Sequence, residues 1–148
     1  MGSILWGIKE SLLSYVAGAS GGRVDLDGVE NADGAFSFPL ATVDGTPGEG
    51  SGVARATGSV CLFGHFGMAI QEIHDPWVEW DGDRAVMSIA QAPASEQRML
   101  AWDLRPMVFR GGEYRAGLVR LTSAGSALFG QQYPQATEFD PLIVRFAD

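Results

Sequence analysis

The stretch Trp6-Gly-Ile-Lys-Glu-Ser-Leu-Leu-Ser-Tyr15-Val16 combines the apolar spacing of a helix with a tyrosine at the margin of its apolar side. At about 100° per residue, one arc of such a helix holds four apolar residues, namely Leu5, Ile8, Leu12 and Val16. Ser3 is a suitable N-cap, and Gly18 is a suitable left-handed end. The spacing therefore predicts an amphipathic helix over residues 4–17, around which the remaining chain packs.

Tyr15 is the residue of this stretch that allows two interpretations. It follows Ser11 by one helical turn and lies at the edge of the apolar arc, so its ring can enter the interior while its hydroxyl stays at a boundary. One interpretation is a rim tyrosine with its oxygen in water. The other is a tyrosine whose oxygen points into a pocket.

The composition indicates one globular domain, residues 1–148, with 46% hydrophobic and 19% charged residues. A net charge of −8 and scattered Lys and Arg argue against a nucleic-acid surface. No apolar run is long enough to span a membrane, and neither a basic nor an apolar signal region precedes Trp6. Cys61, the single cysteine, is expected to be a small buried apolar residue.

Beyond residue 18 the chain shows short alternating segments separated by turn residues. The strand-like segments are residues 23–26, 35–43, 53–57, 59–63, 66–73, 77–80, 84–90, 98–104, 107–110, 114–121 and 139–146. Asp81-Gly82-Asp83 and Gly111-Gly112 predict hairpin turns, and Pro39 predicts an edge strand. Residues 122–132 are expected to form a short second helix capped by Thr122. The predicted fold is all-β: an antiparallel β-sandwich or partly open barrel with an N-terminal amphipathic helix and this second helix.

Three ring-bearing polar residues are further candidates for chemistry. His65 lies in Gly64-His65-Phe66-Gly67, a corner that either presents an imidazole to a flat ligand or holds a turn histidine bonded to the backbone. His74 precedes the turn signal Asp75-Pro76 and is expected at the surface. Tyr133 is either a core aromatic or a site residue, because the following proline fixes where its ring leaves the helix.

The sequence lacks the common catalytic and phosphate-binding signatures. The glycines of residues 45–52 have no P-loop lysine, and there is no Gly-x-Ser-x-Gly, HExxH or CxxC motif. Asp81 and Asp83 belong to a predicted hairpin turn, which favours solvated carboxylates over acid–base catalysis.

Three motifs in order resemble the HtaA-type haem-binding domain of actinobacterial haem uptake proteins. They are Trp6-Gly-Ile-Lys…Ser11…Tyr15-Val16, Gly64-His65-Phe66-Gly67 followed by Asp75-Pro76, and Phe129…Tyr133…Phe139-Asp140-Pro141-Leu142. The resemblance covers nearly the whole chain. One departure is Thr137, which follows Ala136 where the family usually has glycine.

The resemblance implies that Tyr15 is the axial ligand to ferric haem b, with His65 hydrogen-bonded to it and Tyr133 beside the pocket. Ser11 and Phe66 are further expected haem contacts, and Phe63, Met68 and the helix face around Leu12 are candidates to line the slot. A free phenol has a pKa of about 10, so Fe(III) and a neighbouring imidazole would both help it to bind as phenolate.

The function implied by this resemblance is capture and transfer of haem between donor and acceptor proteins, without catalysis. Whether the chain forms a homodimer is a question that the sequence leaves open. Two other functions also stay open: a haem enzyme of catalase or peroxidase type, and an interaction or adhesion module without haem. The family implies an extracellular or cell-surface location, and the missing signal region leaves a cytoplasmic location open.

Overall fold

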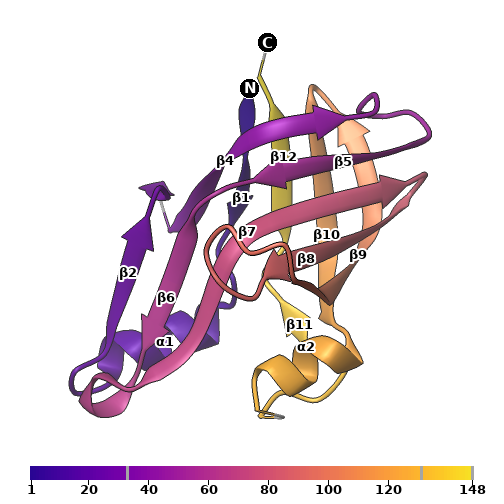
Figure 1. Cartoon of the computed structure of the whole chain (residues 1–148). Helices are drawn as coiled ribbons and strands as arrows, with labels where there is room; N and C mark the ends of the chain where they lie inside the picture. Colours follow the sequence, from indigo (N-terminus) through magenta and orange to yellow (C-terminus); the bar gives the residue numbers. More distant parts are fainter. Residues whose placement is uncertain (33, 131, 148) are drawn as a thin grey trace.

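Eight antiparallel strands pair in a closed ring in the computed structural model, which describes residues 1–32, 34–130 and 132–147 (Figure 1). The order around the ring is β7-β5-β4-β1-β12-β10-β9-β8, and β8 pairs again with β7. The bounds of these strands are β1 Gly2–Trp6, β4 Ala35–Asp44, β5 Ser51–Ala56, β7 Ala69–Asp81, β8 Arg84–Ala90, β9 Arg98–Arg110, β10 Glu113–Leu121 and β12 Leu142–Phe146. The predicted all-β antiparallel class with two helices is confirmed, and the strand pairing identifies the architecture as a barrel.

Smaller elements extend this barrel. They are α1 Glu10–Gly18, β2 Arg23–Asp27, β3 Glu30–Ala32, β6 Ser59–Phe63, the 3-10 turn η1 His65–Gly67, α2 Ser123–Leu128 and β11 Glu138–Phe139. The first half of β7 pairs with β6, and β6 pairs with β2, so these strands form a flange beyond the barrel wall. Both helices lie at the same end of the barrel, opposite the two chain termini (Figure 1). No helix among the described residues is long and apolar enough to cross a membrane.

The core fills the barrel with side chains that alternate along the strands. Phe36, Phe38 and Leu40 share one buried face of β4, as their spacing predicts. At the helical end, Trp6 packs edge-on against Trp102 with ring centroids 4.9 Å apart. Both predicted hairpin turns are confirmed, because Asp81 pairs with Arg84 and Arg110 pairs with Glu113.

The predicted helix over residues 4–17 is wrong in its first half. Residues 2–6 form β1, in which Ile4 and Trp6 are buried on one side and pair with β12 and β4. Ile8 has a φ of 66° and separates this strand from α1, which begins at Glu10. Ser3 is therefore a strand residue and not an N-cap. The backbone N–H and C=O groups of residues 2–6 bond to β12 and β4, so no side-chain cap is needed there.

Three smaller expectations are also corrected. Pro39 does not mark an edge strand: β4 pairs with β1 at this position, and Pro39 falls between the residues paired with β3 and those paired with β5. Asp75-Pro76 does not end a strand, because β7 continues through it with a register shift between His74 and Trp77. Residues 139–146 contain two strands, not one.

The second predicted helix is confirmed in a shorter form. α2 ends at Leu128, and the hydroxyl of its N-cap Thr122 accepts a hydrogen bond of 3.0 Å from the backbone N–H of Gly125. Gly58 has a φ of 112° and separates β5 from β6, so the segments 53–57 and 59–63 are two strands.

Candidate functional site

Helix α1 presents one polar, solvent-facing side. Leu12 and Val16, one turn apart, are buried in the core, whereas Ser11 and Tyr15, also one turn apart, are exposed. The side chain of Tyr15 is 48% exposed. Core packing of Leu12 and Val16 therefore fixes the direction in which the tyrosine points.

The start of α1 is held by Asp140, a residue from the far end of the chain. Its Oδ1 accepts a 3.1 Å hydrogen bond from the backbone N–H of Glu10, while the N-cap residue Lys9 makes no side-chain cap. The backbone carbonyl of Asp140 also accepts a 2.8 Å bond from the indole N–H of Trp6. A Cβ at Gly7 would lie 2.7 Å from the second carboxylate oxygen, so glycine makes this approach possible. The Asp-Pro part of the third motif thus positions α1.

The end of α1 is tied to the η1 corner. The backbone N–H of Phe66 donates a 2.7 Å hydrogen bond to the carbonyl of Ser20, just beyond the helix. Gly21 has a φ of 83°, and a Cβ there would lie 3.0 Å from the backbone nitrogen of Gly67. The glycine turn after the helix therefore allows the two backbones to meet.

This junction brings Tyr15 and His65 together. Their ring centroids are 5.8 Å apart, with the planes at 77°, which is an edge-to-face contact. Gly64 makes room for it, because a Cβ at that position would lie 3.3 Å from Cε2 of Tyr15 and 2.8 Å from Cδ1 of Ile70. His65 is exposed, so the imidazole is presented at the surface as the first of its two interpretations requires.

Phe66 contacts His65, with ring centroids 6.0 Å apart, and Met68 follows two residues later. Phe66 is 86% exposed and Met68 is 70% exposed. The ring of Phe63 is covered by the guanidinium of Arg23, which lies 3.9 Å from its centroid. Leu12 belongs to the core and is not available to a ligand. Of the proposed lining residues, Phe66 and Met68 are therefore the ones that stand free, and an exposed apolar group of this kind is typical of a binding surface.

A hollow of about 280 Å³ lies between the first half of β7 and α2. Its wall includes Ile70 on the side of Tyr15 and Leu128 on α2. This volume is below the roughly 300–1,000 Å³ of pockets that enclose a small molecule. Tyr15, His65 and Phe66 are not among the residues that line this hollow, so the exposed aromatic pair lies outside it.

Tyr133 lies near the other end of α1. Its ring packs on Phe129 and Phe139, with centroids 5.6 and 5.8 Å away, and Lys9 Nζ lies 5.7 Å from its centroid. Partial burial raises the pKa of its phenol above the ordinary value. The described contacts of the Tyr133 ring are with this aromatic group and Lys9, not with the Tyr15–His65 pair, and both interpretations of Tyr133 stay open.

The turn after Tyr133 closes without the glycine that is usual in the family. Ala136 takes the left-handed conformation with a φ of 70°, and the Thr137 hydroxyl donates a 2.6 Å hydrogen bond to the carbonyl of Pro134. The threonine side chain therefore supplies a contact that stabilises this turn.

His74 is not a surface residue. It is 3% exposed, with Nδ1 2.6 Å from Ser59 Oγ and Nε2 3.1 Å from Glu72 Oε1. Because Asp75-Pro76 forms a bulge and not a turn, the strand continues and His74 pairs with neighbours on both sides. Cys61, expected to be buried, is only partly so, and its thiol lies 3.7 Å from Glu72 Oε1.

Comparison with known proteins gives one family and several related structures. The family model HtaA matches residues 1–145. The C-terminal domain of HtaA from Corynebacterium glutamicum has a TM-score of 0.80 at 22% identity, covering 97% of this chain and 93% of that one. The N-terminal domain of the same protein has a TM-score of 0.77 at 21% identity, covering 99% and 97%.

The haem-binding protein HtaB from the same bacterium has a TM-score of 0.72 at 18% identity, covering 97% of this chain and 90% of that one. At these identities the structural matches establish a shared fold. The comparison with curated proteins gave no match.

Proposed function

The chain belongs to the HtaA family, and we propose that it binds one ferric haem b through the phenolate of Tyr15 and passes it to another protein. Haem is the cargo in this proposal and not a resident catalytic group. The HtaB protein, which has the same fold, is a haem-binding protein by name.

The observation that carries the proposal is the contact between Tyr15 and His65. The two residues come from a helix and from a corner between two strands, and their rings meet at 5.8 Å on an exposed rim. Phe66 beside them offers an exposed apolar surface against which a porphyrin can lie. A metal-binding oxygen, a neighbouring imidazole and an apolar surface together suit the capture of ferric haem.

The chemistry follows from the donor set. Phenolate is a hard anionic ligand that favours ferric over ferrous iron. His65 helps Tyr15 to bind in this form by sharing or accepting the phenolic proton, since its ring lies beside the phenol. Fe(III), when bound, acts as a Lewis acid and stabilises the same phenolate.

The exposed position of the site supports a carrier function. Tyr15 is half-exposed and Phe66 almost fully exposed, so a ligand held there keeps one face open to a partner protein. A haem enzyme gains from excluding water and from enclosing the reacting group. We therefore propose transfer between donor and acceptor proteins, without turnover of a substrate.

Titration of the purified chain with hemin tests the proposal. We expect one equivalent of hemin to produce a Soret band, and Tyr15→Phe to abolish the tyrosinate spectrum because it removes only the coordinating oxygen. Ser14→Ala is the matched control, since it removes an exposed hydroxyl from the same helix.

Unchanged spectra and affinity in Tyr15→Phe would contradict the ligand assignment. His65→Ala is expected to keep the Soret band but to weaken binding, because the axial oxygen stays while its proton acceptor is lost. Peroxide turnover well above that of free hemin would favour the enzyme alternative over a carrier.

A further inference from the structure

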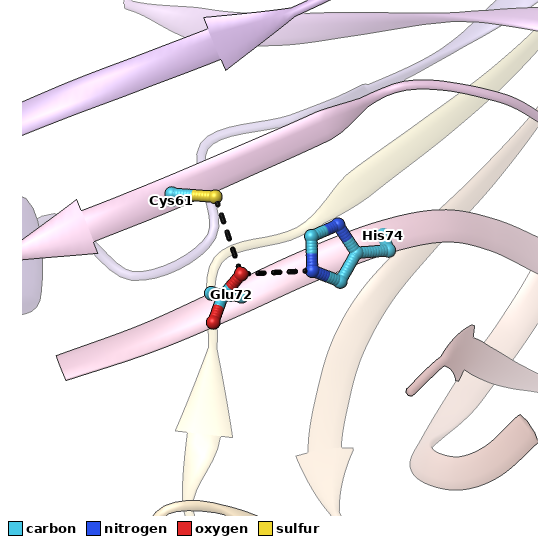
Figure 2. A group of neighbouring side chains, drawn as sticks. All are labelled: Cys61, Glu72 and His74. Carbon is cyan, nitrogen blue, oxygen red and sulfur yellow. Dashed lines mark hydrogen bonds and ion pairs between the residues drawn. The ribbon is translucent and has the colours of Figure 1, made fainter. Parts of the chain in front are cut away.

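Three metal-binding side chains meet on the flange, outside the Tyr15–His65 site. Cys61 on β6 and Glu72 and His74 on β7 each point one donor atom toward the other two, and these atoms all lie within 4.8 Å of one another (Figure 2). Cys61 pairs with Glu72 across the two strands, and His74 is two residues further along β7, so all three occupy one face. The strand register therefore creates the cluster.

His74 is already held in the orientation that a metal ligand needs. Its Nδ1 lies 2.6 Å from the hydroxyl of Ser59, and its Nε2 faces Glu72 Oε1. In a metal-bound form the ring proton is on Nδ1 and is donated to Ser59 Oγ, so that Nε2 has its lone pair free. Fixing the ring through its second nitrogen is the usual arrangement around a ligating histidine.

Two of the three distances between the donor atoms are close to those around a tetrahedral zinc ion, and the third, from the Cys61 sulfur to the imidazole nitrogen, is within 4.8 Å. Zinc bonds of about 2.3 Å to sulfur and about 2.0–2.2 Å to nitrogen and oxygen place S and O about 3.6 Å apart, and N and O about 3.4 Å apart, at tetrahedral angles. The structure has 3.7 Å from Cys61 Sγ to Glu72 Oε1 and 3.1 Å from His74 Nε2 to the same oxygen. A cation bound between them would hold the sulfur and the imidazole nitrogen about 3.6 Å apart, and side-chain rotation would supply the movement.

The surroundings favour a positive charge. Asp25 and Asp27 on β2 pair with Cys61 and Ser59, and their negative charges act on the thiol together with that of Glu72, although Asp25 is also paired with Arg23 at 3.2 Å. Burial, followed by the charge of Glu72 and of these aspartates, raises the pKa of the Cys61 thiol. The thiol is therefore a poor anion by itself. A divalent cation removes this unfavourable interaction, since the carboxylates then face a positive charge.

We propose that Cys61, Glu72 and His74 bind one Zn²⁺ ion, with water as the fourth ligand. On binding, the S–H bond of Cys61 breaks, its proton goes to solvent, and the thiolate forms the Zn–S bond without any change in oxidation state. The side chain of Glu72 is 56% exposed, so the ion has a path to solvent and room for the water. A thiolate, an imidazole and a carboxylate form a donor set typical of zinc.

The consequence for the molecule lies in the β6–β7 connection. The ion joins β6 to β7 on the strands that flank η1, the corner that carries His65. It would therefore brace the hairpin from which the imidazole is presented. The proposal does not depend on haem binding, because neither Tyr15 nor His65 is a zinc ligand.

The experiment uses tag-free, haem-free protein treated with a chelator and then titrated with Zn²⁺ against a chromophoric competitor. We expect one equivalent to bind, and we expect Glu72→Gln and Cys61→Ser each to weaken binding more than tenfold. Ser59→Ala, which removes the partner of the histidine, is expected to weaken binding by about 10–100-fold. Glu79→Gln, an exposed charge change further along β7, is the matched control and should leave affinity unchanged.

Co²⁺ provides a readout on the unmodified protein. Thiolate-to-cobalt charge-transfer absorption and the intense visible bands of tetrahedral cobalt are expected with the parent chain and lost with Cys61→Ser. Absence of the thiolate band, or zinc affinity equal in Glu72→Gln and Glu79→Gln, would overturn the proposal and leave the three residues as a hydrogen-bonded group. Hemin titration of the same variants keeps the two proposals distinguishable, because failure of zinc binding leaves the tyrosine spectrum in place.

Discussion

Substitution of Asp140 is expected to destabilise α1 from the opposite end of the sequence. In Asp140→Ala the backbone N–H of Glu10 loses the side-chain acceptor that lies 3.1 Å away. The bond from Trp6 to the Asp140 carbonyl and the bond from the Asp140 N–H to Ile8 both use the main chain, so they stay. The variant therefore isolates the cap.

The expected magnitude follows from this single contact. Loss of an N-terminal cap costs roughly 0.5–2 kcal/mol, typically about 1 kcal/mol. A negative charge at a helix N-terminus adds about 0.3–1 kcal/mol at exposed positions. Because the contact with Glu10 is exposed, we expect the free energy of unfolding to fall by about 1–1.5 kcal/mol in Asp140→Ala. Asp140→Asn keeps an acceptor oxygen and should lose about 0.5 kcal/mol or less.

Urea denaturation followed by tryptophan fluorescence measures both values, because Trp6 is buried beside the site of the change. Equal losses in Asp140→Ala and Asp140→Asn would refute the capping argument in favour of a charge effect alone. An Asp140→Ala variant as stable as the parent chain would refute the structural role of this residue altogether.

Three further predictions concern the helix, the corner and the thiol. Gly64→Ala should reduce hemin affinity, because the new Cβ would lie 3.3 Å from the ring of Tyr15. Gly117→Ala is the control, since the space around Gly117 is open, and it should leave the affinity unchanged. Equal hemin affinities of the two variants would contradict the packing argument. Leu12→Ala should lower the free energy of unfolding by about 2–5 kcal/mol in chemical denaturation, since Leu12 is buried, and a loss below 1 kcal/mol would show that α1 is not anchored there. Alkylation of Cys61 in metal-free protein at pH 8 should be slower than that of a free cysteine, because the raised pKa of the thiol lowers the thiolate fraction. Glu72→Gln should accelerate the alkylation, because it removes a negative charge beside the thiol. An unchanged rate in Glu72→Gln would argue against a contribution of the Glu72 charge to this pKa.

The fold class was predictable because most of its determinants are local. Period-two alternation and glycine turns, such as Gly111-Gly112, specify strands and hairpins without knowledge of distant partners. The first strand was not predictable in this way. Ile4 and Trp6 fit a strand, but Leu5 and Ile8 also fit the spacing of a helix, and pairing with β12 and β4 decides between them.

The candidate site divides in the same way. Tyr15 and His65 were proposed as site residues from motifs, and the fold places their rings 5.8 Å apart. The capping role of Asp140 was missed, because a cap supplied from the other end of the chain has no local spacing. Glu72 and His74 are two residues apart, so a strand would place them on one face. Their approach to Cys61 was not predictable, because it depends on the β6–β7 register and on a strand that continues through Asp75-Pro76.

The most direct measurement of the central claim is resonance Raman spectroscopy of the ferric haem complex. The account predicts iron–phenolate vibrations that shift when the protein carries ring-deuterated tyrosine and that disappear in Tyr15→Phe. A haem complex without phenolate bands, or one whose phenolate bands survive in Tyr15→Phe, would contradict ligation of haem iron by Tyr15.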